Sequence, residues 1–138
     1  MTWFPLWLAA VASLMTSDEI RFGAVLSELD GVRAEAFASS DPAMLDDVYA
    51  PGSTGRADDA SMIRAYASRD ARVVGADLAL LACKVKSSRA DRVSLDIIDQ
   101  LGASQIVWED GTTRALPRDQ PTRRVVTLVR TEDGWRIS

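Results

Sequence analysis

The sequence predicts an α+β fold in which helices come first and an antiparallel sheet follows. Up to about residue 70, apolar residues recur at spacings of three and four, and after it they alternate with polar ones. A run of helices followed by a run of strands is typical of α+β domains. The 138 residues, 47% of them hydrophobic, are enough for one domain with its own core.

The first helix is expected over residues 16–38. Thr16 and Glu19 have the spacing of a capping box, in which each side chain bonds the other residue's amide. The apolar face that follows consists of Phe22, Val25, Leu26, Leu29, Val32, Ala36 and Phe37.

Two shorter helices should follow. Asp41 is the expected N-cap of the second, with Pro42 in its first position, where the missing amide proton costs nothing. Asp58 or Asp59 is the expected cap of the third. The predicted inner residues are Met44, Leu45, Val48 and Tyr49 in the second helix and Met62, Ile63 and Tyr66 in the third.

The second half reads as strands separated by turn signals. The pattern predicts one long strand over residues 72–86, with a bulge at Gly75. Asp110-Gly111 and Asp133-Gly134 each indicate a hairpin. Further strands are expected over 91–101 and 122–131.

Two residue counts exclude several chemistries. The chain has no histidine, which excludes Ser-His-Asp and Cys-His catalysis and histidine metal sites, and its one cysteine, Cys83, is expected in a buried strand position. The net charge of −4 and the scattered basic residues argue against nucleic-acid binding. The adjacent Arg123 and Arg124 would point to opposite faces of a strand. No cofactor motif is visible, so neither a cofactor nor a metal is expected.

Residues 1–15 form an apolar segment ahead of the domain expected over 16–138. Residues 3–15 carry no charge and include Ala10-Val11-Ala12, which resembles a signal-peptide cleavage site, but no basic residue precedes Arg21. Three interpretations stay open: an export signal or shortened membrane anchor, a start codon assigned ahead of a true start at Met15, or a helix packed on the domain or a partner. The first favours export or membrane association through residues 3–15 over a cytoplasmic location.

Two stretches of the sequence carry a resemblance to a known family. They are "SSDPAMLDDVYAPGS" (39–53), which follows a helix of some twenty residues, and the closing "VTLVRTEDGWRIS" (126–138). Both resemble the nuclear transport factor 2-like superfamily, and within it the SnoaL-like domains common in actinobacterial proteins. The resemblance covers about residues 18–138. It implies a cystatin-like cone, with three N-terminal helices on a strongly curved antiparallel sheet and with Trp135 and Ile137 pointing into the core. Because members include enzymes, ligand binders and association domains, function must be argued from the site.

Asp99 is the candidate catalytic residue. Within residues 91–101, alternation groups it with Val93, Leu95, Ile97 and Leu101 on the more apolar face, which should point inward. Loss of water at such a position favours the uncharged form of a carboxyl group, as a general acid or base near neutral pH requires. The alternative interpretations are that Asp99 lies near the rim, paired with an arginine, or that the register of its strand is reversed, so that Asp99 points outward.

Four further residues are candidates for ligand binding. Tyr49 and Tyr66 lie on predicted inner helix faces, where their hydroxyl groups could stabilise a developing oxyanion. Asp77 lies in the predicted long strand, whose two faces are equally apolar. Trp108 is a candidate wall of a pocket or an interface residue.

Three functions follow as hypotheses. The first is a non-catalytic cone that binds a small apolar ligand or a protein partner. The second is a cofactor-free SnoaL-like isomerase, cyclase or hydratase that uses Asp99 as acid or base. The third is a structural homodimer.

Overall fold

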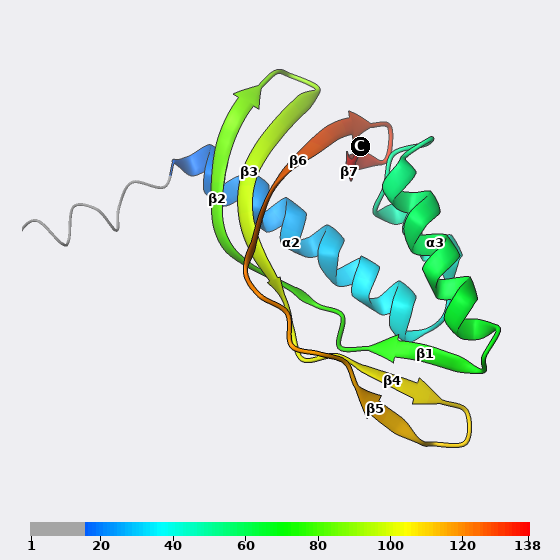
Figure 1. Ribbon diagram of the computed structural model, residues 1–138. Helices are drawn as coiled ribbons and strands as arrows, with labels where there is room; N and C mark the ends of the chain where they lie inside the picture. Colours follow the sequence, from blue (N-terminus) through cyan, green and yellow to red (C-terminus); the bar gives the residue numbers. More distant parts are fainter. Residues whose placement is uncertain (1–15) are drawn as a thin grey trace, which may run out of the picture.

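The structure, a computed structural model, describes residues 16–138 and confirms the α+β class (Figure 1). The prediction for residues 3–15 lies outside the described residues. In this part of the chain, every helix falls short of the length and hydrophobicity that a membrane span requires. The elements in chain order are α2 (Ser17–Ala38), the 3₁₀ helix η1 (Pro42–Asp47), α3 (Thr54–Ala67), β1 (Ala71–Val74), β2 (Leu78–Ser88), β3 (Arg92–Leu101), β4 (Gln105–Trp108), β5 (Thr113–Ala115), β6 (Thr122–Thr131) and β7 (Gly134–Ile137).

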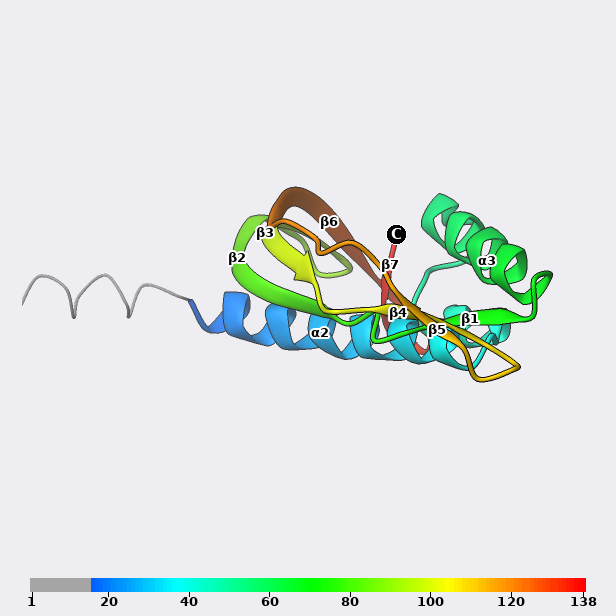
Figure 2. The same ribbon diagram turned by 60° about the horizontal axis from the view of Figure 1, so that its bottom comes forward.

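Helix α2 begins at the predicted capping box. The Thr16 hydroxyl accepts a hydrogen bond from the Glu19 amide, and the Glu19 carboxylate accepts one from the Thr16 amide, both at 3.1 Å. The same carboxylate accepts the Val85 amide at 3.0 Å, which ties the start of the helix to β2. The helix then runs along one side of the sheets (Figure 2). Its buried apolar side chains are Phe22, Leu26, Leu29, Ala34, Ala36 and Phe37.

Three helices were expected ahead of the sheet. The structure has three between residue 16 and the sheet, but only two of them are α-helices and the third is a 3₁₀ helix. The second helix starts as predicted, with the Asp41 carboxylate accepting the Ala43 amide at 3.1 Å, but it is a 3₁₀ helix of six residues. Such short connecting segments commonly adopt the tighter 3₁₀ geometry. Leu45 and Val48 are fully buried, as predicted.

Helix α3 begins earlier than predicted, with Ser53 as its N-cap rather than Asp58 or Asp59. The cap prediction is wrong because Asp59 serves a tertiary contact inside the helix, an ion pair with α2. Met62, predicted to be buried, is 49% exposed. Because α3 packs on η1 and β1, its buried apolar residues are Ala60 and Ile63.

The long strand predicted over residues 72–86 is two strands in different sheets. Strand β1 belongs to a three-stranded sheet of order β1-β4-β5, and β2 to a four-stranded sheet of order β2-β3-β6-β7. Gly75 lies between them with a φ of +81°, and a Cβ atom there would lie 2.6 Å from the carbonyl oxygen of Ala103. Gly75 therefore marks the break between two sheets and not a bulge within one strand.

Replacing Gly75 by alanine is expected to lower the free energy of unfolding by about 2 kcal/mol, because a side chain at this φ is strained and the added methyl group meets backbone. Urea unfolding measures the change. Gly31→Ala is the matched control, since Gly31 is exposed in α2 and its added Cβ meets nothing within 4 Å. That variant should gain up to about 1 kcal/mol. Equal stability of the two variants would contradict the strain at Gly75.

The other strand predictions are confirmed. The Asp110-Gly111 turn joins β4 to β5, and the Asp133-Gly134 turn joins β6 to β7. The predicted inner face of β3 is correct, since Val93, Leu95, Ile97 and Asp99 are all buried. Arg123 and Arg124 point to opposite faces of β6, since each pairs with an aspartate on a different face of β3.

The main core lies between α2 and the inner face of the four-stranded sheet. Trp135 and Ile137 of β7 pack against it, and the Trp135 ring meets Phe22 edge-on with centroids 5.2 Å apart. Cys83 is buried in β2, as predicted. A second cluster joins the end of α2 to η1, α3 and β1, so that α3 packs on the three-stranded sheet through β1.

Candidate functional site

A cleft of about 640 Å³ opens between α2, α3 and the inner face of the four-stranded sheet. Its walls are both charged and apolar. The apolar part consists of Leu78, Leu101, Val125, Val126 and Ile137, and the charged part of five aspartates and two arginines. A wall of this composition suits a small molecule that has an apolar body and a few polar groups.

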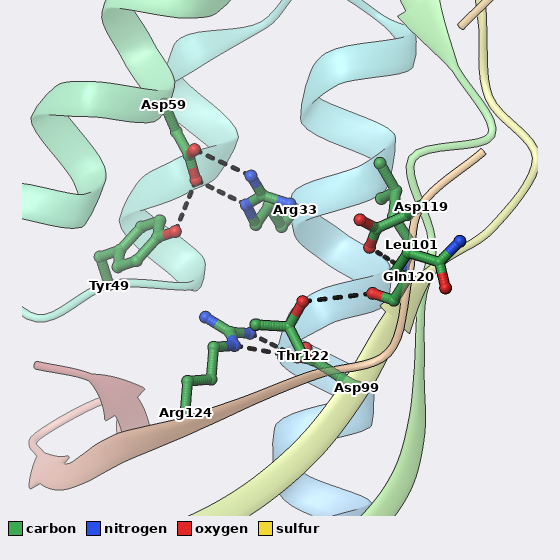
Figure 3. Close-up of polar contacts among 9 residues, drawn as sticks. All are labelled: Arg33, Tyr49, Asp59, Asp99, Leu101, Asp119, Gln120, Thr122 and Arg124. Carbon is green, nitrogen blue, oxygen red and sulfur yellow. Dashed lines mark hydrogen bonds and ion pairs between the residues drawn. The ribbon is translucent and has the colours of Figure 1, made fainter. Parts of the chain in front are cut away.

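On the helical side, the charged groups form one cluster (Figure 3). The Arg33 guanidinium donates two hydrogen bonds to the Asp59 carboxylate, at 2.6 and 2.9 Å. The Tyr49 hydroxyl donates to the same carboxylate at 2.5 Å. Burial, together with this bond, raises the pKa of Tyr49 above its ordinary value, so the hydroxyl keeps its proton. Tyr49 thus lines the cleft, as expected of a ligand-binding candidate, with its hydroxyl hydrogen engaged to Asp59.

On the sheet side, Asp99 is ion-paired with Arg124 of the neighbouring strand (Figure 3). Both contacting nitrogens of Arg124 donate to the same oxygen, Oδ2, at 3.0 and 2.7 Å. Asp99 is 4% exposed, which agrees with the inward position predicted for it. The pairing with an arginine, considered as an alternative for this residue, is present.

Asp30 is a cleft residue that the sequence analysis missed. It lies on α2 with 4% exposure, and within residues 16–138 its carboxyl group makes no hydrogen bond or ion pair. Desolvation raises the pKa of Asp30 to about 6; Arg124 and Arg33 oppose the shift, and Asp99 and Asp59 add to it. One signal in the sequence could have indicated that Asp30 is buried. It lies four residues after Leu26, which puts it on the apolar face of the helix.

Replacing Asp30 by asparagine is expected to stabilise the protein at pH 7.5 by about 2 kcal/mol. Because the pKa of Asp30 is raised on folding, the folded state binds the proton of this carboxyl group more tightly than the unfolded state does. The contribution of Asp30 to stability is therefore greatest below its ordinary pKa and falls as the pH rises through about 6. Urea unfolding at pH 4.5 and 7.5 measures this, and the gain of the variant at pH 4.5 should be about a third of its gain at pH 7.5, because the unfolded-state carboxyl is already largely ionised at pH 4.5.

Asp58→Asn is the matched control for this pH dependence, because Asp58 lines the same cleft but is exposed. Its stability should follow that of the wild type at both pH values. A gain for Asp30→Asn that is equal at pH 4.5 and 7.5 would contradict the buried, uncompensated charge.

The structure does not bring the other three candidate residues to this cleft. Tyr66 is half-buried against the second core cluster. Asp77 is exposed in the connection between β1 and β2, not in a strand. Trp108 lines a separate pocket of about 470 Å³ near the C-terminal end of α3, together with Asp70 and Arg72. Asp77 lies outside a strand because the predicted long strand is broken at Gly75.

Among residues 16–138, no group of three or more acidic or cysteine side chains is placed to hold a metal ion. One member of each adjacent aspartate pair, Asp46-Asp47 and Asp58-Asp59, makes an ion pair instead. Asp46 pairs with Arg56 at 2.6 Å, and Asp59 pairs with Arg33. The chemistry available to the cleft from the described side chains is therefore hydrogen bonding, charge recognition and proton transfer.

Comparison with known proteins shows a shared fold. Neither a protein-family model nor a curated protein matches the sequence. Among solved structures, the intermembrane space region of the chloroplast protein ARC6 is similar, with a TM-score of 0.57, 16% identity, and coverage of 90% of this chain and 95% of that one. A candidate aromatic ring hydroxylase from Novosphingobium aromaticivorans is similar with a TM-score of 0.50, 19% identity, and coverage of 80% and 79%. At these identities the likeness concerns the fold alone.

Proposed function

We propose that this chain is a small-molecule-binding domain of the nuclear transport factor 2-like superfamily, of the SnoaL-like kind, and that the cleft is its binding site. The α+β architecture, the two sequence stretches that resemble the family and the fold likeness to solved structures support the assignment. The observation that carries the binding site is Asp30, a buried carboxyl group in the cleft wall without a hydrogen-bond partner among the described residues. Buried polar groups are normally satisfied by protein or by water, and a ligand with a hydrogen-bond donor would take the place of water at this carboxyl group.

The cleft modifies the ligand expected from the sequence. A purely apolar ligand would leave Asp30 without a partner and would cover the two ion pairs, which loses hydration of charged groups. A ligand with an apolar body and at least one hydrogen-bond donor fits the wall better. The apolar body would contact Leu101 and Val126, and the donor would face Asp30.

A screen of small fragments by amide chemical-shift mapping tests the binding site. Shift changes are expected to cluster on the cleft residues of α2, β3 and β6. Leu101→Trp, which adds an indole to the half-buried cleft wall, should abolish them, whereas Ile20→Trp adds the same group at an exposed position outside the cleft and should not. Fragments that bind only beside Trp108, or none that bind at all, would overturn the assignment.

A catalytic role for the same cleft is the second candidate, and one observation favours it. A carboxyl group with a pKa of about 6 exchanges protons readily near neutral pH, and Asp30 is such a group. In a cofactor-free isomerase, cyclase or hydratase, Asp30 would then move the proton in place of Asp99, which is held by Arg124.

Deuterium exchange at the α-carbon of a ketone probe, cyclohexanone, tests this role in heavy water. Exchange faster than in buffer, and lost in Asp30→Asn, would support acid–base chemistry. Exchange no faster than in buffer would leave binding as the proposed function.

A further inference from the structure

The charges that line the cleft do not balance. Five aspartates face two arginines, so three negative charges are in excess when all seven groups are ionised. Both arginines are already paired, Arg33 with Asp59 and Arg124 with Asp99. No cationic side chain of the described cleft wall is therefore left to receive an anionic ligand.

The three aspartates without an arginine partner, Asp30, Asp58 and Asp119, have different surroundings. Asp58 is exposed and solvated, and the Asp119 carboxylate accepts the Leu101 amide at 2.9 Å. Of the five aspartates of the cleft wall, Asp30 is the one that is buried and makes no hydrogen bond or ion pair to a residue of 16–138. The groups that act on it are Arg33 from its own helix, Asp59 from α3, Asp99 from β3 and Arg124 from β6.

We propose that the ligand of this cleft is an organic cation, a protonated amine whose ammonium group binds the Asp30 carboxylate while its apolar body lies on Leu101 and Val126. This inference rests on the proposed function, because it names the ligand class of the same cleft. The Asp30 carboxylate has no ion-pair partner and no hydrogen-bond donor among residues 16–138. An ammonium group supplies both, since it carries a positive charge and N–H donors. A carboxylate or phosphate ligand would instead add negative charge to a wall that already has it in excess.

The test uses three compounds of one shape that differ in charge: benzylamine, protonated at pH 7.5, neutral benzyl alcohol and anionic benzoate. Amide chemical-shift titrations of the full chain give the affinity of each and locate it. Benzylammonium is expected to bind in the cleft at least tenfold more tightly than benzyl alcohol, and benzoate most weakly of the three. Asp30→Asn should weaken benzylammonium at least tenfold and leave benzyl alcohol within twofold.

Two controls separate Asp30 from general electrostatic attraction. Asp58→Asn removes one charge from the exposed part of the same cleft and should change benzylammonium binding less than twofold. Lowering the pH from 7.5 to 5 should weaken benzylammonium in the wild type, because Asp30 then takes up a proton, and should change it little in Asp30→Asn.

The outcomes distinguish this inference from the function on which it rests. If benzyl alcohol binds as tightly as benzylammonium, or if Asp30→Asn and Asp58→Asn behave alike, the inference is wrong while the binding cleft stands. If none of the three compounds binds but neutral fragments of other shapes do, the inference is again wrong alone. If no fragment of any charge binds in the cleft, the proposed function fails with it.

Discussion

Replacing Asp59 by asparagine is expected to lower the free energy of unfolding by about 3 kcal/mol. The substitution removes the charge that Arg33 faces at 2.6 and 2.9 Å and that accepts the Tyr49 hydroxyl. The Asp59 and Arg33 side chains are 9% and 20% exposed, so water cannot fully replace the lost partner. Removing one member of a buried pair leaves an uncompensated charge, and this cost exceeds the net value of the pair itself. Urea unfolding at pH 7.5 measures the loss.

Two further variants show whether the cost comes from the isolated charge. The double variant Asp59→Leu with Arg33→Met replaces both partners by apolar groups and should recover most of the lost stability. Asp46→Asn breaks an exposed ion pair of the same 2.6 Å length and should cost less than about 1 kcal/mol. A double variant as unstable as Asp59→Asn would mean that the pair contributes through shape and not through charge.

Replacing Leu26 by alanine is expected to cost about 3 to 4 kcal/mol. Leu26 is fully buried at the centre of α2 and belongs to the same core cluster as Val93, Leu95 and Ile97 of β3. The substitution removes apolar contact area and leaves a cavity between two rigid elements, which cannot close fully around it. Thermal and urea unfolding both report the change.

Ile20→Ala is the control on the same helix, since Ile20 is 60% exposed. It should change stability by less than about 1 kcal/mol. Because alanine has the highest helix propensity, neither loss can arise from propensity. If Leu26→Ala and Ile20→Ala lost the same amount, burial against β3 would not set the cost, and the contact between α2 and β3 would not be the main support of the fold.

Local signals predicted much of the fold because their cause is local. The capping box at Thr16 and Glu19 needs only two residues three apart, and the inner face of β3 follows from the alternation of its side chains. The turns at Gly111 and Gly134 need a positive φ that glycine adopts without strain. The predictions that failed depended on distant parts of the chain. Strand β1 separates from β2 because Gly75 closely approaches the backbone of Ala103.

The candidate site was only partly predictable for the same reason. Asp99 was found because it interrupts an apolar face within a single strand. Asp30 was missed because one charged residue in a helix of 22 is ordinary, and its burial arises only when β3, β6 and α3 close around it. Asp59 was read as a helix cap because its partner, Arg33, lies 26 residues away.

By itself, the sequence determined the α+β class, the order of helices before strands, the bounds of α2, β3 and β6 to within one residue, and the exclusion of histidine chemistry. Only the tertiary structure decided which carboxylates share the cleft, which of them the two arginines neutralise, and that Asp30 is left without a partner among residues 16–138. The physical reason is the distance along the chain over which each interaction acts. Hydrogen-bonded turns, caps and side-chain periodicity act within a few residues. Desolvation and charge pairing instead depend on every element that packs around the group.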